Sequence, residues 1–389
     1  MNSMRILIVH PSLLFFGGAE AVVVHLAHAL KRFGAEVSIL TSAVSDDIKT
    51  QCRDIPLIFP DKKASFHFNN PGFFSGLCYF AAQVLVLRGL LKTHGSKFDI
   101  IHVHNFPATW AVALAGIKRR AVWMCNEPPE LWNREQPSLL FRLAYFFGFH
   151  VDRLLVRRSI AKICVSDEIN GKRARLRYGL EPEITPYGID GVFFADTAQD
   201  DPAVFKKFGL PYGFMLVQVG TVTPQKNQKQ SISVLSEIGA KIPGAFLVLA
   251  GPVNEAYRKE LNEDIGRLGL KHKVFFLGHL ASRDIRALYR RADVALFPVK
   301  TQGGWLAPYE ALCAGAPVIV SESMGASWLI KQHGLGIATS DYTQAVLEVE
   351  AHRNHYREMS KSARTWILEN LTWENFAQRH LEICESLCH

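Results

Sequence analysis

The stretch Thr301–Ser321, TQGGWLAPYEALCAGAPVIVS, decides the fold because it places a polar loop, a short helix and a buried strand in direct succession. Pro308 suits the first turn of a helix, Gly315 suits its end, and the apolar run Pro317–Val320 predicts a strand. The N-terminus of such a helix offers free backbone N–H groups to a phosphate. Glu310, expected in that first turn, could accept hydrogen bonds from ribose hydroxyls or simply complement the helix dipole. The unit therefore predicts an α/β fold that holds a nucleotide.

Apolar runs of strand length alternate with helical patterns throughout, and this pattern occurs twice. Such alternation favours parallel sheets covered by helices. The strands expected in the first half are Ile6–Val9, Glu36–Thr41, Ile100–Val103, Ala121–Cys125 and Lys162–Val165. Those expected in the second half are Phe214–Val219, Ala245–Ala250, Val274–Leu277, Val294–Phe297 and Val318–Val320. We therefore expect two Rossmann-like doubly wound domains facing a central cleft, with ligands at the carboxyl ends of the strands.

Composition is that of a folded protein of two domains. The chain has 389 residues, of which 48% are hydrophobic and 21% charged. Its seven cysteines form no C-x-x-C pair, which fits a reducing compartment better than a disulfide framework or a zinc site. The N-terminus lacks a signal-peptide pattern, and the longest apolar stretch, residues 73–91, is interrupted by polar residues and glycines. We expect a cytoplasmic protein with no membrane span.

Charge is concentrated in the first half. Residues 1–186 carry 23 Lys and Arg against 15 Asp and Glu, whereas residues 187–389 carry 21 of each. Many of these bases lie between Lys118 and Arg177, around the apolar run Leu139–Phe149. Such a surface could meet an anionic membrane or a lipid-diphosphate acceptor, which would place the protein peripherally on the cytoplasmic face of a membrane, or it could be a solvated face. Nucleic acid is disfavoured because no recognition motif accompanies the charge.

In each half of the chain, a glycine-containing loop follows the first expected strand. Gly17 and Gly18 precede a helical pattern, and glycine lets backbone approach a phosphate at a helix N-terminus. No G-x-G-x-x-G pattern occurs there, which disfavours a dehydrogenase. In the second half, Gly220 and Thr221 precede Lys226. A lysine at this position could stabilise the negative charge that grows on a leaving phosphate, or it could be a surface lysine at a helix start.

Two further loops are expected at strand ends in the first half. They contain His104 in one loop and Asn126 and Glu127 in the next. Glu127 could accept a proton from an attacking hydroxyl or could cap a turn. The sequence contains no Asp-x-Asp motif and no clustered His and Cys ligands, so we expect chemistry without an essential metal.

Together these segments resemble the retaining GT-B glycosyltransferases of glycosyltransferase family 4, also described as glycosyl transferases group 1. The C-terminal signature is matched by Leu306, Glu310, Ala311, Gly315, Pro317 and Val318. The departures from the family pattern are Gln302 in place of Glu, Trp305 in place of Gly, Thr221 where Arg is usual, and Asn126 where His is frequent.

The resemblance implies a domain division and a reaction. The first domain would comprise residues 1–186 plus 372–389, because a final helix returns to it, and the second would comprise residues 187–371. A hexosyl unit would move from a UDP-sugar or GDP-sugar to a hydroxyl of a glycan or lipid-linked glycan, with no cofactor. The donor-binding residues would be Gly17, Gly18, Gly220, Thr221, Lys226, Gln302, Gly304, Trp305, Leu306 and Glu310. The catalytic candidates would be Lys226, Glu127, Asn126 and His104.

The departures at Thr221, Asn126 and Gln302 leave a rival function open. In it, the chain is a catalytically impaired GT-B subunit that binds a nucleotide sugar or glycan in support of a partner enzyme. A second alternative keeps the fold and changes the reaction to nucleotide-sugar epimerisation or glycan phosphorolysis.

Overall fold

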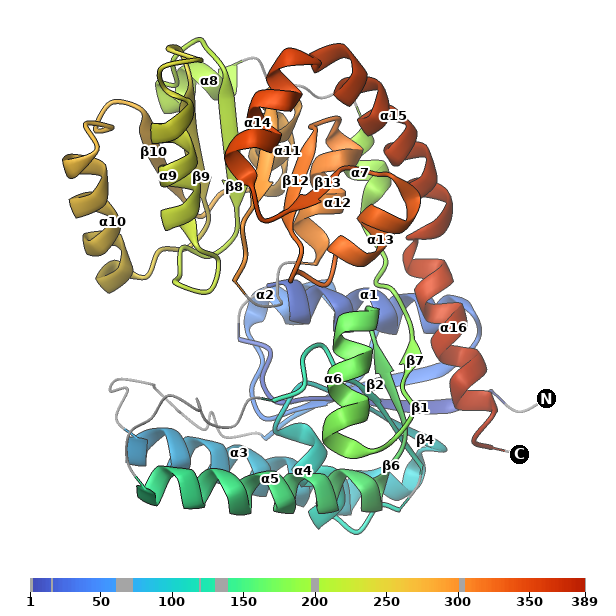
Figure 1. Cartoon of the computed structure of the whole chain (residues 1–389). Helices are drawn as coiled ribbons and strands as arrows, with labels where there is room; N and C mark the ends of the chain where they lie inside the picture. Colours follow the sequence, from blue (N-terminus) through green and yellow to red (C-terminus); the bar gives the residue numbers. More distant parts are fainter. Residues whose placement is uncertain are drawn as a thin grey trace. The chain divides into compact units, whose positions relative to one another are not determined.

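The computed structural model describes residues 3–14, 17–60, 73–118, 120–129, 139–196, 203–300 and 305–388. The chain divides into two compact units. Domain 1 comprises Met1–Gly188 and Trp373–His389, and domain 2 comprises Ile189–Thr372. Each domain is built on one parallel sheet with helices packed against it (Figure 1). The expected pair of Rossmann-like domains is therefore confirmed.

Domain 1 contains a seven-stranded parallel sheet with the order β3-β2-β1-β4-β5-β6-β7. Its strands are β1 Arg5–His10, β2 Glu36–Thr41, β3 Leu57–Ile58, β4 Ile100–His104, β5 Ala121–Met124, β6 Ile160–Val165 and β7 Glu183–Ile184. Its α-helices are α1 Gly18–Arg32, α2 Asp46–Gln51, α3 Phe73–His94, α4 Ala108–Leu114, α5 Leu139–Ser159, α6 Glu168–Tyr178 and α16 Trp373–Glu385. Strand order reverses between β1 and β4, and ligands of doubly wound sheets bind at such a switch point.

Successive side chains of the central strands point to opposite faces of the sheet, and helices cover both faces. Leu7 and Val9 of β1 and Ile101 and Val103 of β4 are fully buried and belong to a core that also contains residues of α3, α4 and α5. Side chains of neighbouring positions in a strand point to opposite faces, so His102 lies on the other face of β4. The face with the apolar core is covered by α3, α4 and α5.

The final helix, α16, packs on domain 1. Trp373 stacks on His25 of α1 with the ring centroids 4.4 Å apart. His380 Nδ1 lies 2.9 Å from His102 Nε2 in the interior. A Cβ at Gly188 would lie 2.5 Å from the Trp373 backbone nitrogen, so only glycine permits this close approach. The segment after domain 2 is thereby fixed to the buried face of β4.

Domain 2 contains a six-stranded parallel sheet with the order β10-β9-β8-β11-β12-β13. Its strands are β8 Met215–Val219, β9 Phe246–Ala250, β10 Val274–Gly278, β11 Val294–Phe297, β12 Val318–Ser321 and β13 Ile337–Thr339. Its helices are α7 Gly191–Ala195, α8 Ala203–Phe208, α9 Gln228–Ile238, α10 Glu255–Arg267, α11 Ser282–Arg291, α12 Leu306–Ala314, α13 Ser327–His333, α14 Tyr342–Ala351 and α15 Arg353–Asn370. The switch point of this sheet lies between β8 and β11.

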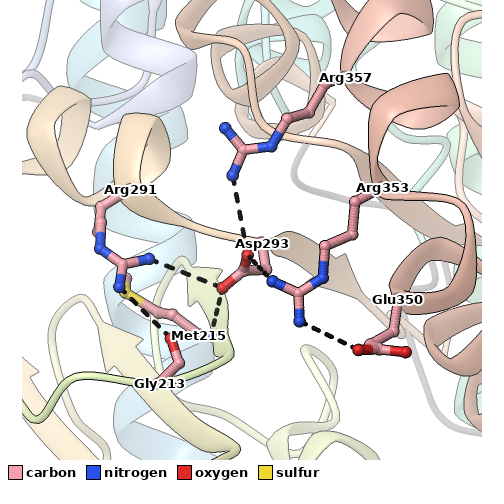
Figure 2. Close-up of polar contacts among 7 residues, drawn as sticks. All are labelled: Gly213, Met215, Arg291, Asp293, Glu350, Arg353 and Arg357. Carbon is pink, nitrogen blue, oxygen red and sulfur yellow. Dashed lines mark hydrogen bonds and ion pairs between the residues drawn. The ribbon is translucent and has the colours of Figure 1, made fainter.

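The amino end of the domain 2 sheet is held by one buried carboxylate. Asp293, which precedes β11, accepts a 2.8 Å hydrogen bond from the Met215 N–H at the start of β8 (Figure 2). Its two oxygens also face Arg291 at 3.7 Å, Arg353 at 3.4 Å and Arg357 at 3.7 Å. This cluster joins α11 and α15 to the end of the sheet that is opposite the switch-point loops.

The long apolar stretch of domain 1 lies in α3, which packs against α4. Within the part of the chain that the structure describes, no helix combines the length and the apolar character needed to cross a membrane.

Candidate active site

In domain 2, two glycines bring the loops after β8 and β9 into contact. Gly220 and Gly251 both have φ of +144°, in a region that favours glycine. The Gly220 N–H donates a 2.8 Å hydrogen bond to the Ala250 carbonyl. A Cβ added at Gly251 would lie 2.2 Å from the Gly220 oxygen. Only glycine fits at position 251, and the backbone next to the switch point is therefore held in this conformation.

The loop after Gly220 is fixed by two buried glutamines. Gln218 Nε2 donates a 2.7 Å hydrogen bond to the Lys226 carbonyl. Gln228 Oε1 accepts a 3.3 Å hydrogen bond from the Thr223 N–H, and its Nε2 donates to the Thr221 carbonyl at 3.1 Å. The structure thus places Thr221, which is exposed, and Lys226, which is partly buried, on a loop with a defined backbone.

Hydrogen bonds cross the switch point of domain 2. Asn227, with φ of +56°, donates from Nδ2 to the Pro298 carbonyl at 3.0 Å. The Lys300 N–H donates to the Gln225 carbonyl at 3.1 Å. Because Pro298 and Lys300 follow β11, the loops after β8 and β11 form one connected surface at the carboxyl end of the sheet.

The signature helix begins earlier than the sequence suggests. Trp305 occupies the N-cap position of α12 and is buried against Tyr309, with the ring centroids 4.6 Å apart. Leu306, the first helical residue, is partly buried. Glu310 is therefore the fifth residue of the helix, in the second turn and not in the first turn as expected. The predicted donor-binding residues Gln302 and Gly304 lie outside the described residues.

Glu310 has an unusual electrostatic environment for an acid near a helix start. Its side chain is partly buried, and burial raises its pKa to about 7. The carboxylate of Asp190 acts in the same direction. Burial also raises the pKa of the Tyr289 phenol well above its ordinary value, with a further contribution from Glu310. Glu310 is thus a carboxyl group whose charge changes near neutral pH.

In domain 1, a hydrogen-bonded chain links the carboxyl ends of four strands. His10 ends β1, and its Nε2 lies 2.9 Å from Nδ2 of Asn105, which follows β4. Asn126, two residues after β5, donates from Nδ2 to Asn105 Oδ1 at 2.5 Å. Tyr187, after β7, donates from its hydroxyl to Asn126 Oδ1 at 2.5 Å. We call His10, Asn105, Asn126 and Tyr187 the polar chain; it crosses the switch point between β1 and β4.

The polar chain is neutral at neutral pH. Tyr187 donates to Asn126, so each amide in turn presents its nitrogen to the next acceptor, and His10 Nε2 accepts. The imidazole proton of His10 therefore lies on Nδ1. Burial lowers the pKa of His10 to about 4, against a smaller opposite effect of a backbone hydrogen bond with Ser12. This site offers hydrogen bonds and no positive charge.

The other residues predicted for domain 1 occupy different environments. His104 is the last residue of β4 and is fully buried, with its ring centroid 4.9 Å from that of His102. Burial lowers the pKa of His104 well below its ordinary value, and neighbouring histidines act in the same direction. His104 lies on the same face of β4 as His102, which packs against His380 of α16. Glu127 is exposed directly after Asn126.

The glycine loop of domain 1 begins α1. Gly17 occupies the N-cap position and Gly18 is the first helical residue. Glu20 is buried, which raises its pKa, while hydrogen bonds from the backbone N–H groups of Glu20 and Gly17 act in the opposite direction. The acid of this motif thus turns back onto the start of its own helix.

Sequence reasoning did not select His10, Asn105 or Tyr187 as site residues. His10 and Asn105 share one signal, a polar side chain at the carboxyl end of an apolar strand that flanks the switch point. Tyr187 has no such signal, because two residues separate it from the short strand β7. Among the residues described, no group of three or more His, Cys, Asp or Glu side chains is arranged to hold a metal ion.

Two family models match the chain. The model described as "Glycosyltransferase Family 4" matches residues 16–190, and the model described as "Glycosyl transferases group 1" matches residues 201–366. The chain therefore belongs to the glycosyltransferase family that these two models describe, glycosyltransferase family 4 or glycosyl transferases group 1.

Two bacterial enzymes are among the curated relatives of this chain. Over 215 residues it is 26% identical to the "GDP-mannose-dependent alpha-(1-6)-phosphatidylinositol monomannoside mannosyltransferase" of Mycobacterium tuberculosis. That match covers 51% of this chain and 54% of the relative, so the chain spans about half the length of that enzyme. Over 360 residues it is 24% identical to the "D-inositol 3-phosphate glycosyltransferase" of Salinispora arenicola, covering 85% of this chain and 77% of the relative.

Solved structures show the same fold. The glycosyltransferase resembles Anabaena Alr3699/HepE, whose crystal structure is in complex with UDP and glucose, with a TM-score of 0.76 and 19% identity. The likeness covers 98% of this chain and 100% of that chain. It identifies the two Rossmann-like domains as a GT-B fold.

Proposed function

We propose that this glycosyltransferase moves a hexosyl unit, with retention of configuration, from a nucleoside-diphosphate sugar to a hydroxyl of a glycan or lipid-linked glycan. The observation that carries the proposal is the position of Lys226, on a loop fixed by Gln218 beside Gly220 at the domain 2 switch point. Two relatives support the donor class. Alr3699/HepE was crystallised with UDP and glucose, and the mycobacterial relative is named as GDP-mannose-dependent.

Domain 2 would receive the donor. Breaking the bond between the sugar and its phosphate leaves a nucleoside diphosphate, and the Lys226 ammonium group would stabilise the charge that develops on it. Gly220 would let backbone approach the phosphates, and Glu310 would accept hydrogen bonds from the ribose hydroxyls. Thr221, Trp305 and Leu306 would line the same donor site. Because a lysine and backbone N–H groups would supply the electrostatic stabilisation, we propose that transfer needs no essential metal.

Domain 1 would receive the acceptor and the transferred sugar. Asn126, held by Tyr187 and Asn105, would hydrogen-bond sugar hydroxyls. Glu127 is exposed beside it and is our candidate to accept the proton of the attacking hydroxyl. His104 is neutral and buried, so its contribution would be to support the strand end under Asn105.

The acceptor would lie at a membrane surface on the cytoplasmic side. The net positive charge of residues 1–186 supports this placement, since anionic headgroups attract basic surfaces. The mycobacterial relative is named for transfer to a phosphatidylinositol mannoside, which is a lipid-linked glycan.

Turnover of labelled UDP-sugars and GDP-sugars by the purified protein tests the proposal. Lys226→Ala should lower the rate on the order of 100-fold or more, as loss of one charge-stabilising donor commonly does. Lys229→Ala is the matched control, because Lys229 is exposed three positions later and pairs with Asp264 at 3.0 Å. A rate that Lys226→Ala leaves unchanged would remove this residue from the mechanism.

The same experiment separates the rival function. Binding of UDP or GDP with neither transfer nor slow donor hydrolysis would favour a catalytically impaired subunit that supports a partner enzyme. The departures at Thr221, Asn126 and Gln302 motivate this alternative.

A further inference from the structure

One face of α5 exposes large apolar side chains to solvent. Phe146 is 56% exposed, Phe147 64%, Val151 43% and Leu154 65%. At 100° per residue these four positions fall within an arc of about 140° on the helix. The opposite side of α5 is buried against domain 1 through residues such as Asp152. Isolated exposed apolar residues are ordinary on a protein surface, whereas four on one helix face form a patch.

Two arginines complete this stripe. Arg157 and Arg158 are exposed in the last turn of α5 and fall on the same face as the four apolar residues. From Phe146 to Arg158 the stripe runs about 18 Å along the helix axis. We call Phe146, Phe147, Val151, Leu154, Arg157 and Arg158 the α5 face. The exposed His150 lies within the same arc, so the face is mostly apolar with one imidazole along it, and it is positively charged at its end.

The neighbouring helices extend the apolar and basic character of this layer. α4 contacts both α3 and α5 (Figure 1). Leu85 of α3 is 60% exposed and Leu114 at the end of α4 is 45% exposed. Arg88 of α3 donates from Nε to the Leu114 carbonyl at 3.1 Å, so a guanidinium lies beside Leu114 in the same layer.

The sequences of α3, α4 and α5 contain a single acidic residue, Asp152. Asp152 has no exposed surface. Its carboxylate accepts hydrogen bonds from Arg177 at 2.8 Å, Tyr178 at 2.9 Å and Trp110 at 2.8 Å. It therefore cannot offset the charge of the arginines at the surface. A second copy of this chain is a poor occupant of the α5 face, because a symmetric contact would bring like charges together with no exposed acid from these helices to pair them.

We propose that the α5 face binds an anionic membrane surface. Phe146, Phe147, Val151 and Leu154 enter the boundary between headgroups and acyl chains, where a helix lying in the plane buries its apolar side. Arg157 and Arg158 meet the negatively charged headgroups. This inference deepens the proposed membrane location by naming its residues, and it can be tested without turnover.

The test is co-sedimentation of the full chain with vesicles of phosphatidylglycerol mixed with phosphatidylcholine, and with vesicles of phosphatidylcholine alone. The double variant Phe146→Ser/Phe147→Ser should bind the anionic vesicles roughly tenfold more weakly or worse at every salt concentration. The double variant Arg157→Gln/Arg158→Gln should lose roughly tenfold at low salt and most of its salt dependence. All four side chains are exposed, so both variants should retain the native thermal unfolding profile.

Two controls make the outcome decisive. Leu176→Ser removes an apolar side chain that is 82% exposed on α6 of the same domain, and it should leave vesicle binding unchanged. Lys226→Ala should also bind vesicles normally, because membrane binding precedes chemistry. Vesicle binding with no affinity for UDP or GDP would refute the proposed reaction and leave the α5 face intact.

Three results would overturn the inference. One is a wild-type chain that does not prefer anionic vesicles, and another is equal binding by the double phenylalanine variant and wild type. The third is concentration-dependent self-association that the phenylalanine variant abolishes, which would make a second copy the occupant of this face.

Discussion

Replacing Glu310 with Gln should stabilise the ligand-free protein at alkaline pH. Burial and the Asp190 carboxylate raise the pKa of Glu310 from 4.5 to about 7. The folded state therefore holds a proton that the unfolded state releases between about pH 4.5 and 7. Stability attributable to this group falls as pH rises through that window, because ionisation is penalised only in the folded state. Glutamine has no charge to bury and escapes the penalty.

A pKa rise of that size corresponds to about 3 kcal/mol at pH values above 7. Glu310 keeps some contact with solvent, which reduces the penalty, and we expect Glu310→Gln to gain about 1–2 kcal/mol at pH 8. At pH 4.5, where the folded state is protonated and the unfolded state is half protonated, the gain should fall to a few tenths of a kcal/mol. The change in unfolding free energy at pH 8 and at pH 4.5 can be measured by urea unfolding, with hydrogen exchange in domain 2 as the probe. Glu260→Gln on α10 is the control, because Glu260 is exposed in the same domain.

The same variant should bind nucleotide more weakly, because an amide is a poorer acceptor than a carboxylate for two ribose hydroxyls. Calorimetry with UDP and GDP should therefore show lost affinity in a protein that is more stable without ligand. An equal stability change at pH 4.5 and 8 would refute the electrostatic reasoning. Unchanged nucleotide affinity would refute the ribose role.

Three other substitutions test the parts that hold the site. Gly251→Ala should cost about 2 kcal/mol or more in unfolding free energy, since its Cβ would lie 2.2 Å from a backbone oxygen, whereas Gly269→Ala, with nothing within 4 Å, should cost less. Tyr187→Phe should cost about 1 kcal/mol and lower the transfer rate without changing UDP affinity, which calorimetry and kinetics can separate. Asp293→Asn should lower the urea midpoint of domain 2 by the equivalent of about 2 kcal/mol, because three arginines lose a buried partner.

The central strands could be predicted within two residues of each end because parallel strands buried on both faces are continuous apolar runs. The strands that escaped prediction are β3 Leu57–Ile58, β7 Glu183–Ile184 and β13 Ile337–Thr339. They have two or three residues, lie at sheet edges, and are only partly buried. In β7, one of the two residues is Glu183, which forms ion pairs with Lys162 and Arg379. The strand therefore contains no apolar run that could predict it.

The position of a candidate site residue could be predicted where it follows directly from the order of strand, loop and helix along the chain. A glycine and a lysine between an apolar strand and a helix had to lie at the carboxyl end of the sheet, and the structure puts Gly220 and Lys226 there. The environment of His104 was not predictable. His104 is buried because α16 covers its face of β4. The contact that holds α16 there joins His102 to His380, which is 278 residues away in sequence.

The two switch points differ in charge, and this difference argues for a division of work between the domains. His10 is neutral at neutral pH because its pKa is about 4, so the polar chain of domain 1 can only donate and accept hydrogen bonds. Lys226 gives domain 2 a cation on a fixed loop. A leaving diphosphate needs positive charge, whereas sugar hydroxyls need directional neutral partners. If phosphate groups instead contacted the domain 1 chain, His10→Ala would lower diphosphate affinity and Lys226→Ala would leave it unchanged; that pair of results would reverse the assignment.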